Sequence, residues 1–220
     1  DEFMAEEAEA ANAAKRPELP ITVVLGNPPY SGHSANKGEW IQSLMRGGNL
    51  QSSGSYFQFN KEPLGERQPK WLSDDYVKFV RLAQWCVDAS RAGVVGYVTN
   101  HGYLDNPTFR GMRESLMESF SSIRVLDLHG NLKKREVSPD GTRDENVFDI
   151  MQGVAIALLS SPGRCDAAAA AQHADLFGTR DAKYAFLSKA SLDTPAWVPL
   201  TPAPPFDLFI PRNSNMEAEY

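Results

Sequence analysis

The stretch that organises this sequence is Ile21-Thr22-Val23-Val24-Leu25-Gly26-Asn27-Pro28-Pro29-Tyr30. Its first five residues are apolar or β-branched and lack polar alternation, which predicts a buried parallel strand. Gly26 permits a sharp exit from that strand. The two prolines then fix the backbone and remove two amide donors. The segment therefore predicts a rigid, acceptor-rich loop at the carboxyl end of a strand, where open α/β sheets bind their ligands.

The residues of this loop suit a flat substrate that carries an amino group. The Asn27 side-chain oxygen and the Pro28 carbonyl can accept both hydrogens of an NH₂ group, and the Tyr30 ring can stack on a heterocycle. Two acceptors out of the ring plane localise the lone pair of the amine and disperse positive charge as the amine attacks a methyl group. A plain Pro-Pro turn is the alternative, but a buried strand that runs into Asn-Pro-Pro-Tyr favours chemistry.

Further apolar runs and caps predict the rest of the domain. We expect helices over 1–16, 73–92 and 107–120, strands over 94–99, 123–128 and 147–159, and a polar hairpin over 130–146. Gly93 is expected to cap the second helix. Residues 31–69 predict a long loop, either a solvated insertion or a lid over the substrate.

The spacing of these segments predicts the sheet. Helix-length segments separate the first three strands, at 21–26, 94–99 and 123–128, which suits parallel pairing. A hairpin-like link precedes the fourth, at 152–159, so we expect that strand to be antiparallel and to lie at or beside the edge of the same sheet.

The pattern changes after residue 163. The Ala-rich stretch over 166–176 is compatible with either a strand or a helix. Residues 196–211 contain five prolines, so regular structure is not expected there. We therefore divide the chain into a catalytic unit over 1–163 and an extension or linker over 164–220 that leads toward another module.

Composition narrows the functional class. The 220 residues carry a net charge of −6, so any DNA contact must come from a local basic cluster or from another part of the protein. Cys86 and Cys165 are the only cysteines and neither belongs to a CxxC pair, so we expect no metal site and a reducing cytoplasm. No stretch is long and apolar enough to span a membrane.

Asn27-Pro28-Pro29-Tyr30 resembles motif IV of the amino-methyltransferases that use S-adenosylmethionine, above all the N6-adenine DNA methyltransferases. Residues 20–160 more narrowly resemble the methyltransferase part of type ISP and helicase-methylase restriction-modification enzymes. That narrower resemblance rests on four further segments: Tyr97-Val98-Thr99-Asn100-His101-Gly102-Tyr103-Leu104, Phe109-Arg110-Gly111-Met112-Arg113, Leu126-Asp127-Leu128-His129-Gly130-Asn131 and Asp144-Glu145-Asn146-Val147-Phe148-Asp149.

The resemblance implies a Rossmann-like α/β methyltransferase fold with S-adenosylmethionine as cofactor. The glycine-containing turn that holds this cofactor is expected before the Asn27 loop, but no such strand and turn precede residue 21. We therefore expect only the catalytic half of a γ-class enzyme here, and weak or no binding of the cofactor by this chain alone. The expected partners are double-stranded DNA, the cofactor-binding half, and target-recognition, helicase or nuclease modules in a bacterial or phage cytoplasm.

Other residues are candidates for substrate contacts. Phe148 matches the second aromatic of the γ class, which would contact an extruded adenine. His101 is a weaker candidate for a base, because the reaction needs no strong base and a lone loop histidine is usually a hydrogen-bonding scaffold. Asn100 and Asp105 could contact substrate or cap the following helix. The best phosphate-binding patch is a basic run in the hairpin, Lys133, Lys134 and Arg135.

Three functional interpretations follow. The first is methylation of the N6 amine of adenine in DNA. The second is methylation of another planar amine or amide, such as a protein glutamine or an RNA base, which Asn-Pro-Pro-Tyr alone does not distinguish. The third is a non-catalytic interaction module that keeps the fold and binds no cofactor. The segments after residue 96 favour DNA.

Overall fold

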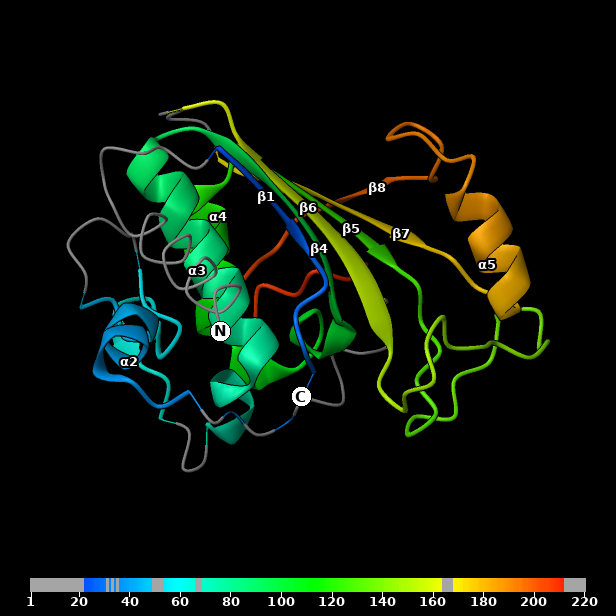
Figure 1. Ribbon diagram of the computed structural model, residues 1–220, viewed down its shortest axis with the longest axis horizontal. Coiled ribbons are helices and arrows are strands. Elements are labelled where there is room, and N and C mark those ends of the chain that lie inside the picture. The colour runs from blue at the N-terminus through cyan, green and yellow to red at the C-terminus, as the bar shows by residue number, and fades with distance from the viewer. Residues whose placement is uncertain are drawn as a thin grey trace, which may run out of the picture.

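The computed structural model describes residues 22–30, 32, 34, 36–48, 54–65, 69–163 and 168–211. It is an α/β fold built on a six-stranded mixed sheet in the order β1-β4-β6-β5-β7-β8 (Figure 1). The helix predicted over 1–16 lies outside the described residues. The strands are β1 Val23–Gly26, β2 Gln58–Phe59, β3 Glu62–Pro63, β4 Gly93–Asn100, β5 Ser122–Asp127, β6 Val154–Ser161, β7 Ala170–Asp175 and β8 Val198–Leu200. The helices are α2 Glu39–Met45, η1 Lys70–Ser73, α3 Asp75–Ser90, η2 His101–Tyr103, η3 Pro107–Phe109, α4 Arg110–Ser119 and α5 Arg180–Leu187.

The four predicted strands share one sheet, as expected. β1 pairs with β4 in parallel, and β6 runs antiparallel to both β4 and β5. The prediction that the fourth strand lies at or beside the edge is wrong: β6 lies between β4 and β5, and β7 and β8 continue the sheet beyond β5. The carboxyl ends of β1, β4, β5 and β7 therefore share one rim.

Strand β1 differs from the prediction of a buried strand. It forms one edge of the sheet, and Val23 and Leu25 are 59% and 73% exposed. Val94 on the neighbouring strand is also exposed, at 45%. An apolar run predicts that a strand is buried, but it does not determine whether the strand lies in the centre of the sheet or at its edge.

Helix α3 begins after Asp74, close to the start of the helix predicted over 73–92. It ends at Arg91, whose φ of 64° supplies the left-handed cap, and not at the predicted Gly93, which is the first residue of β4. Helix α4 is preceded by a short 3-10 turn with Pro107 in its first turn and the Asn106 side chain as its cap.

The segment over 31–69 is more ordered than a loop. Helix α2 and the β2–β3 pair lie within it, and buried side chains of α3 fasten it to the domain. The Arg81 guanidinium donates to the carbonyls of Leu44 and Gly54, at 2.9 and 2.8 Å. The Tyr56 hydroxyl, fully buried, donates to Gln84 Oε1 at 2.9 Å. The described part of this segment is therefore a packed insertion.

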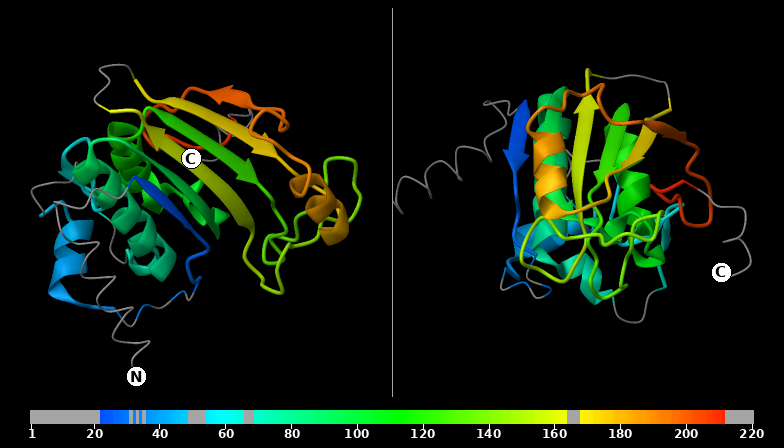
Figure 2. Two further views of the ribbon diagram at one scale, coloured as in Figure 1. Left: turned by 45° about the horizontal axis from the view of Figure 1, so that its top comes forward. Right: turned by 90° about the vertical axis from the view of Figure 1, so that its right-hand side faces the viewer.

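Helices α2, α3 and α4 lie together on one side of the sheet (Figure 2). Two separate hydrophobic cores pack against the sheet. The larger core lies between the sheet and helices α2, α3 and α4, and it includes Val95, Leu116 and Phe209. The smaller core gathers Leu126, Val147 and Val154, with side chains from α5 and the segment after it packed against them. Among the described residues, no helix is long and apolar enough to cross a membrane.

Residues beyond 163 continue the same domain, which corrects the predicted boundary. The undecided Ala-rich stretch forms β7. Within the proline-rich segment, only Val198–Leu200 is a strand, and the rest lacks helix or strand as expected. That segment then returns to the larger core, where Phe209 is fully buried and its amide donates to Leu104 O at 2.9 Å. Arg113 of α4 also donates two hydrogen bonds to Phe206 O.

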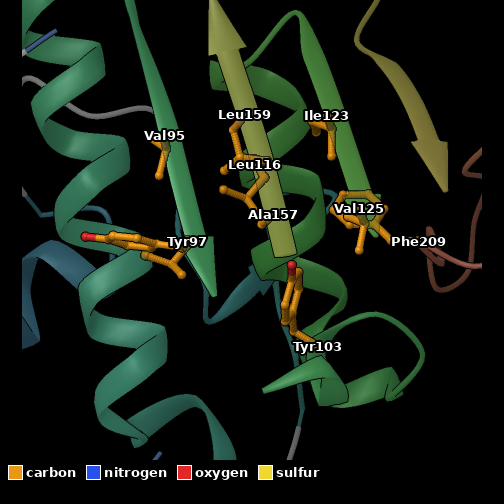
Figure 3. A pocket seen from close by; sticks show the side chains of 10 residues that line it. Val95, Tyr97, Tyr103, Leu116, Ile123, Val125, Ala157, Leu159 and Phe209 are labelled. Atoms are coloured by element: carbon orange, nitrogen blue, oxygen red, sulfur yellow. The ribbon is translucent and has the colours of Figure 1, made fainter. Parts of the chain in front are cut away.

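A small cavity lies inside the larger core, between the sheet and its helices (Figure 3). Its volume is about 10 Å³, and its lining is apolar apart from two tyrosine rings. Within the described part of the chain, the buried Tyr103 hydroxyl has no partner in good hydrogen-bonding geometry, and the Thr99 side chain is the polar group beside it. The lining residues are Val80, Val95, Tyr97, Tyr103, Leu116, Ile123, Val125, Ala157, Leu159 and Phe209.

Candidate functional site

The Asn27–Tyr30 loop leaves the carboxyl end of β1. Pro28 is buried and Asn27 is exposed. Gly26 lets the chain pass close to β4, because a Cβ atom there would lie 3.1 Å from the Tyr97 ring. The Tyr30 hydroxyl lies 2.6 Å from Asn27 Oδ1 and 2.9 Å from the carbonyl oxygen of Val98 on β4. Both atoms are acceptors, so the single hydroxyl proton is shared between them and holds the loop against the sheet.

In this geometry Asn27 Oδ1 can still accept a hydrogen bond from a substrate, and the Tyr30 hydroxyl holds it in place. Asn27 Oδ1 keeps a second lone pair for an incoming amine, because a carbonyl-type oxygen has two. The Tyr30 ring is half-buried and meets the Tyr76 ring edge-on, with centroids 6.3 Å apart. Burial raises the pKa of Tyr30 well above its usual value, so its hydroxyl remains a neutral donor. The Asn27 oxygen is thus oriented before any ligand arrives.

His101 follows β4 on the same rim and is buried. Its Nδ1 lies 3.1 and 3.2 Å from the two Asp127 carboxylate oxygens, so this nitrogen carries the hydrogen. Its Nε2 accepts from Asn131 Nδ2 at 2.9 Å, and the imidazole is fully engaged. The ring lies against Gly153, where a Cβ atom would be 2.3 Å from it. This arrangement favours the scaffold role for His101.

His129 follows β5 and faces carboxylates from both ring nitrogens. Its Nε2 lies 2.8 Å from Asp175 Oδ1. Its Nδ1 is 3.7 Å from Asp127 Oδ2 and 3.8 Å from Glu136 Oε1. Burial alone would lower the pKa of His129, but the three carboxylates outweigh burial and raise it to about 9. His129 is therefore an imidazolium at neutral pH, and its ring stacks on Phe177 at 3.8 Å.

The same cluster has the spacing of a metal site, a feature that the cysteine pattern could not indicate. Ligand atoms of His101, His129 and Glu136 all lie within 4.8 Å of one another, a separation that could hold an ion. The ring nitrogens of His101 and His129 nevertheless all have hydrogen-bond or ion-pair partners without a metal ion. Asn131 donates to the one unprotonated nitrogen of His101, and His129 is positively charged between its carboxylates. We assign the cluster to structure.

The basic run of the 130–146 segment does not act as one patch. Lys134 Nζ lies 2.6 Å from Asp105 Oδ2, so Asp105 pairs with Lys134 and caps no helix. Asn100 does cap the short η2 turn, accepting from Gly102 N at 2.8 Å. Lys133 and Arg135 are exposed. The segment itself is a series of turns with one isolated bridge between Val137 and Arg143, and not a stranded hairpin.

Phe148 lies in the bends that precede β6. Its ring is half-buried against the smaller core, and its amide donates to Asn146 Oδ1 at 2.9 Å. It lines an open groove of about 480 Å³, to which no residue of the Asn27–Tyr30 loop contributes. The groove is lined by Leu132, Arg143, Asp144, Glu145, Asn146, Phe148, Asp149, Ile150, Met151, Arg180 and Asp181.

Helix α5, which no sequence pattern predicted, contributes Arg180 and Asp181 to the lining of this groove. Lys183 of α5 is fully buried and lies 2.7 Å from Asp144 Oδ1, which is also fully buried. The same carboxylate accepts from Gly130 N and Gly178 N, at 2.7 and 2.8 Å. This buried ion pair joins the ends of β5 and β7 to the Phe148 segment.

Comparison with known proteins adds structural neighbours. No protein-family model and no curated protein matches the chain. The fold is similar to part of a nuclease-deletion mutant of the Type ISP restriction-modification enzyme LlaGI in complex with a DNA substrate mimic. That match has a TM-score of 0.73 and 23% identity, and it covers 94% of this chain and 20% of that one.

Two further neighbours are DNA complexes. The ATP-dependent Type ISP restriction-modification enzyme LlaBIII bound to DNA matches 99% of this chain, with a TM-score of 0.69 and 25% identity. The DrdV–DNA complex matches 89% of this chain, with a TM-score of 0.65 and 23% identity. The chain covers 14% and 18% of these proteins. This α/β fold therefore occurs within DNA-bound enzymes of the restriction-modification class.

Proposed function

We propose that this chain is the catalytic part of an S-adenosylmethionine-dependent N6-adenine DNA methyltransferase, within a restriction-modification enzyme of the type ISP kind. The observation that carries the proposal is the loop after β1, in which the Tyr30 hydroxyl orients Asn27 Oδ1 at the carboxyl rim of the sheet. The similarity to DNA-bound Type ISP enzymes supports DNA as the substrate class.

The chemistry attributed to this chain is acceptance of the amine hydrogens. Asn27 Oδ1 and the Pro28 carbonyl take the two N–H groups and hold the amine lone pair toward the methyl donor. As the N–C bond forms, positive charge grows on the nitrogen, and these acceptors stabilise it where it develops. Transfer would break the bond between the methyl group and the donor sulfur, which would leave as a neutral thioether, and the methylated nitrogen would release one proton to solvent. His101 is not assigned to this step, because Asp127 and Asn131 engage both of its ring nitrogens.

The cofactor supplies an electrophilic methyl group on a sulfonium. The sequence contains no Gly-x-Gly-x-x-Gly motif, and no residue of this chain is assigned to holding the cofactor. Exposed Lys133 and Arg135 are the proposed contacts to DNA phosphates, while Lys134 is neutralised by Asp105. Phe148, which precedes β6 on the same rim, is proposed to contact the extruded base.

The decisive experiment is methyl transfer to duplex DNA under single turnover by the intact protein, with DNA binding measured separately. Asn27→Ala should lower the rate about a hundredfold or more and leave the dissociation constant within a few-fold, because its acceptor matters most when charge develops. Asn27→Asp is the matched control, since it keeps an acceptor and should retain more activity. Near wild-type methylation by Asn27→Ala would reduce the loop to a structural turn.

Tyr30 separates two contributions in the same assay. The sequence alone predicts that Tyr30→Phe is mild, since the ring is retained for stacking. The hydroxyl contact with Asn27 Oδ1 leads us to expect an intermediate loss, roughly tenfold, because the acceptor loses its orientation. Tyr30→Ala should also weaken binding of an extruded base.

A further inference from the structure

Helix α5 presents three donors on one face toward the segment that carries Phe148. Arg180, Lys183 and Tyr184 occupy positions i, i+3 and i+4, which lie on the same side of a helix. Burial of apolar side chains does not explain how this face of α5 packs, because the buried residue of the helix is Lys183.

These donors reach four successive backbone carbonyls. Lys183 Nζ donates to Glu145 O at 2.6 Å, and Arg180 Nε donates to Asn146 O at 2.8 Å. The Tyr184 hydroxyl donates to Val147 O at 2.5 Å, and Arg180 Nη2 donates to Phe148 O at 3.0 Å. Consecutive carbonyls of an extended strand point to opposite sides, so one helix face reaches all four only because this segment is bent.

Two further contacts fix the ends of the same segment. The amide of Arg180 donates to Glu145 Oε2 at 2.9 Å, and its guanidinium pairs with Asp149 Oδ1 at 2.8 Å. The backbone on both sides of Phe148 is therefore held by side chains that follow it by more than 30 positions. A loop that served only to connect β5 with β6 would not need every carbonyl from 145 to 148 bound.

We propose that α5 is a positioning element that sets the place of the Phe148 ring, with Arg180 and Tyr184 as its positioning residues. This inference rests on the proposed function, in which Phe148 contacts the extruded base. Because Arg180 and Tyr184 act through the backbone, their loss displaces the ring without removing any group that touches substrate. Displacements of about 1 Å at a reacting pair can cost on the order of a hundredfold in rate.

A double-mutant cycle tests the inference. Tyr184→Phe removes one hydroxyl from a half-exposed side chain, and Arg180→Ala removes the three guanidinium contacts. Each should lower single-turnover methylation about tenfold and change DNA affinity less than threefold. In a Phe148→Leu background each should change the rate less than twofold, because the ring on which they act is absent.

The matched control is Arg143→Ala. Arg143 lines the same groove, is 83% exposed and makes one ion pair, with Glu145 at 3.4 Å. Its removal should leave the rate unchanged. Equal losses from Arg180→Ala with and without Phe148, or a wild-type rate for both α5 variants, would overturn the inference.

A second readout needs no methylation. With 4-fluorophenylalanine at position 148, Arg180→Ala and Tyr184→Phe should shift or broaden the ¹⁹F resonance, and Arg143→Ala should not. An unchanged resonance in both α5 variants overturns the positioning role. An intact protein that transfers no methyl group, yet shows these ¹⁹F changes, refutes the proposed function and keeps the positioning role of α5.

Discussion

The charge on His129 makes a testable prediction about stability and pH. Its ring nitrogens face Asp175, Asp127 and Glu136, which hold the pKa at about 9 although burial alone would lower it. An unfolded histidine titrates near 6.5. Because the folded pKa is the higher one, the stabilisation is fully present below about pH 6.5 and is lost as the pH rises through about 9.

The magnitude follows from the two pKa values. The difference between about 6.5 and about 9 corresponds to roughly 3 kcal/mol of the free energy of unfolding. Only 13% of the His129 side chain is exposed, so solvent screening reduces this figure little. His101 also contacts Asp127, and His173 also contacts Asp175. The contribution of His129 to stability is therefore measured as the difference between the wild type and a variant that lacks His129.

The assay is urea-induced unfolding of the wild type and His129→Asn at several values between pH 6 and pH 9.5. Asparagine tolerates the left-handed backbone that His129 adopts, with φ of 52°, so the variant removes the charge without backbone strain. The stability difference between the two proteins should be largest near pH 6 and should shrink by about 3 kcal/mol by pH 9.5. Two parallel stability curves would refute the charged state of His129.

Two further substitutions test buried polar groups by denaturant unfolding. Lys183→Met should destabilise the protein by about 3–5 kcal/mol, because it leaves the fully buried Asp144 carboxylate without its ion-pair partner. Lys133→Met, at an exposed site, is the control and should change stability by less than about 0.5 kcal/mol. Equal effects of the two substitutions would contradict the buried ion pair. Tyr103→Phe should cost less stability than Tyr56→Phe, because the Tyr103 hydroxyl has only the Thr99 side chain beside it, whereas the Tyr56 hydroxyl donates to Gln84 at 2.9 Å. The Tyr56 variant should lose about 1 kcal/mol, and the reverse order would show that the Tyr103 hydroxyl is the more strongly bonded.

The hydrophobic pattern was sufficient to predict the three neighbouring strands β4, β6 and β5. The apolar runs that form β4, β5 and β6 are flanked by helix caps and turn residues, so the run and its flanks indicate the same strand. The Asn27 loop was placed correctly at a carboxyl end for the same reason. What the pattern could not supply was the hydrogen bond from the Tyr30 hydroxyl to Val98 O, because it depends on β4 lying beside β1.

The missed elements share a physical cause. Helix α5 turns Arg180 and Lys183 inward, so its buried side is polar and hydrophobic periodicity does not identify it. In β7, the buried His173 donates to Phe209 O at 2.9 Å, so a polar residue occupies a core position through a partner 36 residues away. Long-range hydrogen bonds of this kind carry no local sequence signal.

The polar contacts also decide where the functional unit ends. A unit that stopped at residue 163 would leave His129 without Asp175 and the fully buried Asp144 without Lys183. It would also expose the β5 edge that β7 covers. Buried charges without partners cost several kcal/mol each, comparable with the whole stability of a domain of this size. Because β7 and α5 supply those partners, the rim that carries Asn27 and Phe148 requires the residues after 163. The proposed chemistry therefore depends on the whole six-stranded domain and not on residues 1–163 alone.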